Sequence, residues 1–79
     1  MATFIDAVNA QRELDRLVHG ERDQRELAVT AAARIGYLLE AVAYGDSERV
    51  KNEILRVAAP LLEMYTKQES AGEQLAFNF

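Results

Sequence analysis

The chain has 79 residues, a net charge of −4, a hydrophobic fraction of 49% and no cysteine. This length allows one small domain with a thin core, and the lack of cysteine excludes disulfides and thiolate metal sites. The acidic balance disfavours binding to nucleic-acid phosphates, so we expect no nucleic-acid partner. We see neither a long apolar run nor a signal-peptide pattern, and therefore expect a cytoplasmic protein without membrane contact.

The first predicted helix opens at Thr3, where Asp6 three residues on completes a variant of the capping box. Its apolar residues recur at helical spacing, although Gln11 interrupts the stripe. They are Phe4, Ala7, Val8, Leu14, Leu17 and Val18. His19 and Gly20 resemble a helix C-terminus, where a lone histidine suits the helix dipole better than it suits catalysis.

The second predicted helix starts near Asp23, with Glu26 three residues on, and ends at Gly45. Its apolar stripe consists of Leu27, Ala31, Ile35, Leu38 and Val42, with Ala28 and Leu39 beside it. Asp46 or Ser47 can then cap a third helix.

The third predicted helix has an apolar stripe of Val50, Ile54, Val57, Leu61 and Met64, flanked by Leu55, Leu62 and Tyr65. Pro60 lies inside this pattern, so we expect a kink or break near residues 57–60. Ser70, Ala71 and Gly72 have the composition of a flexible linker.

These elements predict an all-α fold: a small three-helix arrangement built on an antiparallel helical hairpin, with an extended C-terminal tail. Residues 1–67 form the predicted helical domain, and residues 68–79 form the linker and the apolar tail. Because one such chain covers its apolar faces poorly, a homodimer is plausible.

Three small residues, Ala28, Ala32 and Gly36, are spaced four apart on the second predicted helix. Small residues allow two helix backbones to approach closely. They predict a helix-packing seam, either against the protein's own helices or against a second copy or another partner. Gly36 costs about 1 kcal/mol relative to alanine inside a helix, which suggests that its lack of a side chain is used.

Residues 11–26 are dense in charges of both signs, and we interpret them as a solvated surface with ion pairs along the helix. No nucleophile motif, phosphate-binding loop or metal-ligand spacing is found, so we expect no enzyme, no catalytic or metal-binding residue and no cofactor. A helix-turn-helix interpretation of residues 25–42 is disfavoured, because the segment after Gly36 lacks side chains that read bases.

The last residues, Gln74-Leu75-Ala76-Phe77-Asn78-Phe79, place two of the three phenylalanines at the chain end. This hexapeptide resembles the short motif by which bacterial replication and repair proteins bind the β sliding clamp: Gln-Leu, any residue, Leu, any residue, Leu or Phe. Gln74, Leu75 and Phe79 fit that pattern, and Phe77 stands where leucine is usual. In an extended segment, Leu75, Phe77 and Phe79 would share one apolar edge.

Two interpretations of function follow. In the first, the protein is a small non-enzymatic interaction module, a bacterial or phage adaptor or inhibitor that docks on the sliding clamp through Gln74, Leu75, Phe77 and Phe79. In the second, it is a phage-type inhibitor of a host protein or a structural dimer, which uses a helical face while the tail packs on its own core.

Overall fold

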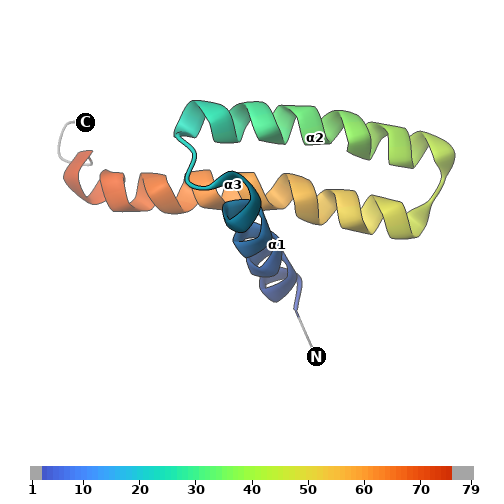
Figure 1. Cartoon of the computed structure of the whole chain (residues 1–79), viewed down its shortest axis with the longest axis horizontal. Coiled ribbons are helices and arrows are strands. Elements are labelled where there is room, and N and C mark those ends of the chain that lie inside the picture. Colours follow the sequence, from blue (N-terminus) through green and yellow to red (C-terminus); the bar gives the residue numbers. More distant parts are fainter. Residues whose placement is uncertain (1–2, 76–79) are drawn as a thin grey trace.

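The computed structural model of the chain describes residues 3–75, and the side chains of residues 3–70. Within this part the structure is all-α, with three helices: α1 (Phe4–His19), α2 (Gln24–Tyr44) and α3 (Ser47–Leu75). Helices α2 and α3 form a long antiparallel hairpin, and α1 crosses α3 at a steep angle (Figure 1). Both α1 and α2 pack against α3. The predicted fold class and hairpin are confirmed.

The predicted helix ends are formed by local interactions. The Thr3 hydroxyl accepts from the amide of Asp6 at 3.1 Å, and the Asp6 carboxylate accepts from the amide of Thr3 at 3.1 Å, which completes the capping box. The Asp23 side chain caps α2 in the same way, through the amide of Glu26 at 2.8 Å. Gly45 then ends α2 with a φ of 70°, in the left-handed region that glycine adopts without strain.

The apolar core is thin. Its buried hydrophobic side chains are Val8, Leu27, Ala31, Ala41, Val57 and Ala59, with Pro60 buried beside them. Three of them are alanines, which contribute little apolar area. Three charged residues, Asp15, Arg34 and Glu53, are buried beside them.

The central polar contact joins all three helices. Arg34 of α2 donates from Nη1 and Nη2 to the Asp15 carboxylate of α1 at 2.7 and 2.9 Å. The same Nη1 also donates to the backbone carbonyl of Arg56 in α3 at 2.8 Å. Both Arg34 and Asp15 are buried, each with 7% of its surface exposed.

This contact explains why Pro60 does not break α3. Proline has no N–H, so the carbonyl four residues earlier, that of Arg56, loses its helical donor. The Arg34 guanidinium supplies that donor from the neighbouring helix. The ring of Pro60 is fully buried. The predicted break is therefore wrong: α3 runs without interruption from Ser47 to Leu75.

The solvated surface predicted for residues 11–26 is also wrong in part. Asp15 is buried against Arg34, and Gln11 donates to the same carboxylate at 3.0 Å. The side of α1 that faces α3 is therefore largely polar. As a consequence Leu14, Leu17 and Val18, which we expected on the packed face, are exposed to 53%, 82% and 65%.

The second helix departs from its predicted stripe in the same way. Leu27 and Ala31 are buried as expected, but Ile35 and Val42 are exposed, because the buried Arg34 turns the packed face toward residues 27, 31, 34 and 41. Helix α2 continues through Gly36 without a turn, so no helix-turn-helix is formed there.

The third helix extends further than predicted. The expected linker residues Ser70 to Gly72 lie in α3, which ends at Leu75. Their neighbours Glu69, Glu73 and Gln74 favour helix, which offsets the cost of about 1 kcal/mol for one glycine. The helical body is therefore longer than residues 1–67.

Replacing Arg34 by methionine should lower the free energy of unfolding by roughly 3–5 kcal/mol, because Asp15 is left buried without its partner. Urea unfolding followed by circular dichroism measures this. Arg49→Met is the matched control, since its 3.2 Å pair with Glu40 is at the surface, where such a pair contributes about 1 kcal/mol or less. Equal losses in the two variants would contradict the assigned role of Arg34.

Pro60→Ala should weaken the dependence of stability on Arg34. Residue 60 then has an N–H for the Arg56 carbonyl, which no longer needs the guanidinium. We expect Arg34→Met to lose about 1 kcal/mol less in the Pro60→Ala background than in the native chain, the value of one hydrogen bond. A double-mutant cycle by urea unfolding measures this coupling, and strict additivity would exclude it.

Candidate protein-interaction surfaces

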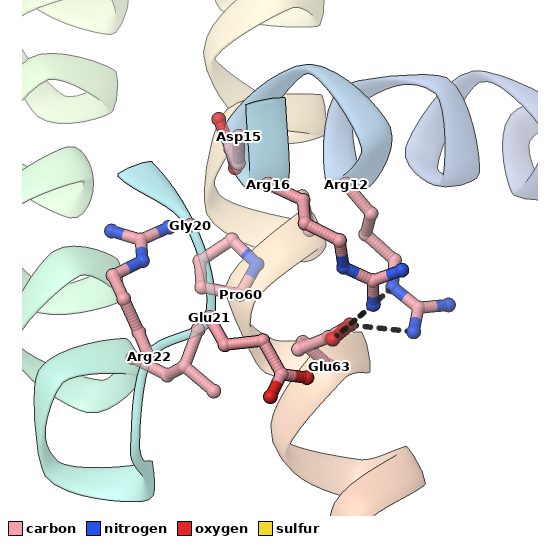
Figure 2. A pocket seen from close by; sticks show the side chains of 10 residues that line it. Arg12, Asp15, Arg16, Gly20, Glu21, Arg22, Pro60 and Glu63 are labelled. Atoms are coloured by element: carbon pink, nitrogen blue, oxygen red, sulfur yellow. Dashed lines mark hydrogen bonds and ion pairs between the residues drawn. The ribbon is translucent and has the colours of Figure 1, made fainter. Parts of the chain in front are cut away.

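A second ionic cluster lies between α1 and α3, one helical turn from the central contact. Arg12 donates from Nε and Nη2 to Glu63 at 2.9 and 2.6 Å, and Arg16 donates from Nη2 to the other carboxylate oxygen at 2.7 Å. Figure 2 shows both arginines reaching from α1 toward Glu63. The cluster fixes the angle at which α1 crosses α3.

The cavity beside this cluster is too small for a substrate. It is lined by Arg12, Arg16, Glu63 and Pro60 among others, and it has room for about 20 Å³. That volume is close to what one water molecule needs. Arg12 and Arg16 are both paired with Glu63, so this cluster is explained as a structural contact between helices.

The charges around both carboxylates favour their ionised forms. Burial by itself raises the pKa of Asp15, but hydrogen bonds from Arg34 and Gln11 and the charges of Arg34 and Arg22 outweigh it, so the pKa lies below its ordinary 3.8. Burial likewise raises the pKa of Glu63, and the hydrogen bonds and charges of Arg12 and Arg16 bring it below its ordinary 4.5.

An apolar hollow of about 250 Å³ lies where the start of α1 meets the first half of α3. Phe4, Ile54 and Leu55 line it, with Lys51 at its edge. It is open to solvent, and Phe4 is 55% exposed. Among the side chains that line it, Lys51 alone carries an ionisable group, and no second polar group is placed beside it.

The predicted seam on α2 does not pack against the protein's own helices. Ala28, Ala32 and Gly36 are all exposed, and a Cβ built on Gly36 would meet no atom within 4 Å. The interpretation as an intramolecular seam is therefore wrong. Most of the exposed residues around them are also apolar, with the charged Arg25 and Glu40 at the margins, so α2 presents a largely apolar face to solvent.

Helix α2 is also long and apolar enough, by length and composition alone, to cross a membrane. Only 22% of its most apolar 18-residue stretch is buried. We did not expect this from the sequence, because no uninterrupted apolar run is present. Arg34, near the middle of α2, donates hydrogen bonds to Asp15 and to the Arg56 carbonyl. That buried contact ties α2 to the other helices.

The predicted tail site is only partly described. Gln74 and Leu75 lie in the last turn of α3, whereas Phe77 and Phe79 lie outside the described residues. His19 is the last residue of α1 and is exposed, as the sequence predicts. Over residues 3–70, no three histidine, cysteine, aspartate or glutamate side chains are grouped so that they could hold a metal ion.

Comparisons of the chain with protein-family models, with curated proteins and with solved structures found no match.

Acidification should destabilise the protein below about pH 4.5. Because the folded-state pKa values of Asp15 and Glu63 lie below their unfolded values of 3.8 and 4.5, their stabilising contribution is complete above pH 4.5 and is lost as the pH falls through the folded values. Urea midpoints measured between pH 7 and pH 2.5 test this. Glu63→Gln should reduce the loss, and a midpoint that is independent of pH would contradict it.

Proposed function

We propose that the protein is a small non-enzymatic interaction module that docks on the bacterial β sliding clamp through residues Gln74 to Phe79. The observation that carries the proposal is the position of this hexapeptide at the end of α3. Helix α3 projects past the start of α2, so its last turns stand clear of the packed body (Figure 1). Gln68, Glu69 and Ser70 are all exposed there.

The length of α3 argues against one form of the alternative, in which the tail covers the core around Val57 or the hollow at Ile54. Leu75 is 18 residues from Val57 and 21 from Ile54 along this helix, which corresponds to about 27 and 31 Å. The four residues after Leu75 span at most about 14 Å even when fully extended. While α3 is intact, neither Val57 nor the hollow at Ile54 is within reach of the phenylalanines of the same chain.

Docking in the form that the motif resemblance implies requires Gln74 and Leu75 to leave the helix. In an extended segment Leu75, Phe77 and Phe79 then share one edge, and the Gln74 amide can donate and accept hydrogen bonds that fix the register. The last turn of a helix opens easily, since its final carbonyls have no helical partners. Gly72 lowers the helix stability further.

The affinity expected from these contacts is modest. Burial of one leucine and two phenylalanines contributes roughly 1.5–3 kcal/mol each, and the ordering of the segment offsets part of it. A micromolar dissociation constant, about −8 kcal/mol, is consistent with this balance.

The proposal predicts that removal of residues 74–79 abolishes clamp binding and leaves the thermal midpoint within about 2 °C of the native value. Phe77→Ala should weaken binding at least tenfold, because one anchor is lost. Isothermal calorimetry with purified β clamp measures the first result and circular dichroism the second. Gln68→Ala, exposed on the same helix, is the matched control and should bind normally.

A different outcome is expected if the tail packs on its own core. If Phe77→Ala or the truncation lowers the melting temperature by ten degrees or more, with no heat on mixing with the clamp, the phenylalanines belong to the core. On the scale of roughly 4–8 °C per kcal/mol, such a drop corresponds to the loss of one or more buried side chains. That outcome would exclude the clamp proposal.

A second candidate function rests on a different observation, the exposed apolar face of α2. In this alternative, a host protein is bound and blocked by the helical body. The two functions differ in where the activity lies: truncation after residue 73 removes the first and preserves the second.

A further inference from the structure

The exposed face of α2 has the spacing of a helix-packing seam. Its members are uncharged, and each has another member three or four residues away, over more than four turns. They are Ala28, Val29, Ala32, Ile35, Gly36, Leu39, Val42 and Ala43, hereafter the α2 face. Val29 and Leu39 are 61% and 66% exposed. Residues 28, 32, 35, 39 and 42 follow the alternating 4,3 spacing of a coiled-coil interface.

We propose that the α2 face binds the same face of a second copy of this chain, with the two α2 helices antiparallel. This inference does not depend on the clamp proposal. It concerns a different surface, on the helix that precedes α3.

The sizes of the side chains favour the antiparallel alignment. An antiparallel pair centred between Ile35 and Gly36 places Gly36 opposite Ile35 and Ala32 opposite Leu39 of the second copy. At these four central positions each large side chain meets a small one, which favours close packing. A parallel pair in register would instead place Leu39 against Leu39.

Charges at the two ends of the face favour the same alignment. Arg25 lies at the start of α2, is exposed, and forms no ion pair within residues 3–70. Asp46 lies just beyond the other end and is also exposed. The antiparallel alignment brings Arg25 of each copy near Asp46 of the other, whereas a parallel alignment would bring the two arginines together.

Another copy of the chain explains this face better than a lipid bilayer does. Arg25, Glu26 and Glu40 are also exposed on α2, and charged side chains in the hydrocarbon region are costly. Arg34 is held by Asp15 in the bundle, so insertion of α2 would break the central contact of the fold.

The test uses cysteines introduced into the full chain, which has none of its own. Residues beside the two-fold axis meet their own copies, so Ile35→Cys and Gly36→Cys should each form a disulfide-linked dimer under mild oxidation. Ala28→Cys should not, because its copy lies about 22 Å away along the helix. Mixing Ala28→Cys with Ala43→Cys chains should restore the crosslink.

Solution size provides the second readout. By sedimentation equilibrium the native chain should be a dimer, and Leu39→Glu should be a monomer with unchanged helicity. Ala33→Glu is the matched control, because Ala33 is exposed on α2 outside the α2 face, and it should leave the dimer intact.

Three results would overturn the proposal. The first is a native chain that stays monomeric up to about 0.5 mM, well above micromolar affinity. The second is efficient crosslinking of Ala28→Cys with itself, which indicates a parallel pair. The third is flotation of the native chain, but not of Leu39→Glu, with phosphatidylcholine–phosphatidylglycerol vesicles, which assigns the face to a membrane.

Discussion

The fold depends on one guanidinium group. Arg34 neutralises the buried carboxylate of Asp15 and donates to the carbonyl that Pro60 leaves without a helical partner. A proline inside a helix usually costs about 3 kcal/mol or more. Here a side chain from the neighbouring helix replaces the hydrogen bond that the proline removes, which offsets part of that cost. The same side chain holds α1 in place through Asp15. Removal of Arg34 leaves the Arg56 carbonyl without this donor and the buried Asp15 carboxylate without its cationic partner.

Because polar groups occupy the centre, apolar side chains are displaced to the surface. Arg34 and Asp15 take positions that a leucine would occupy in an ordinary three-helix core, and three of the six buried hydrophobic residues are alanines. The bidentate pair between Arg34 and Asp15 has a strict geometry, so it fixes how the three helices are aligned. Apolar burial is reduced at the same time, which explains why a domain of this size exposes Leu17, Leu39 and Tyr44.

Features that depend on residues within one helical turn could be predicted from the sequence, whereas features that depend on distant residues could not. Helix starts at Thr3 and Asp23 and the end at Gly45 follow from residues within one turn, and all three are observed. The packed side of α1 depends on Asp15 meeting Arg34, nineteen residues away, and no periodicity rule reveals such a pairing. The continuity of α3 through Pro60 depends on the same distant donor. Of the tail site, only the positions of Gln74 and Leu75 in α3 are described.

The two proposed surfaces are compatible in space, and together they constrain the assembly. The α2 face lies on the hairpin, whereas the last turns of α3, which contain Gln74 and Leu75, project beyond the start of α2 (Figure 1). In an antiparallel α2 pair, the two α3 helices therefore end at opposite ends of the dimer, separated by at least the length of α2, about 31 Å. Two tails on one rigid body increase avidity only for partners whose binding sites match that separation. Dimerisation would then favour partners with two binding sites at this separation, while the tail sequence determines which site each tail can bind.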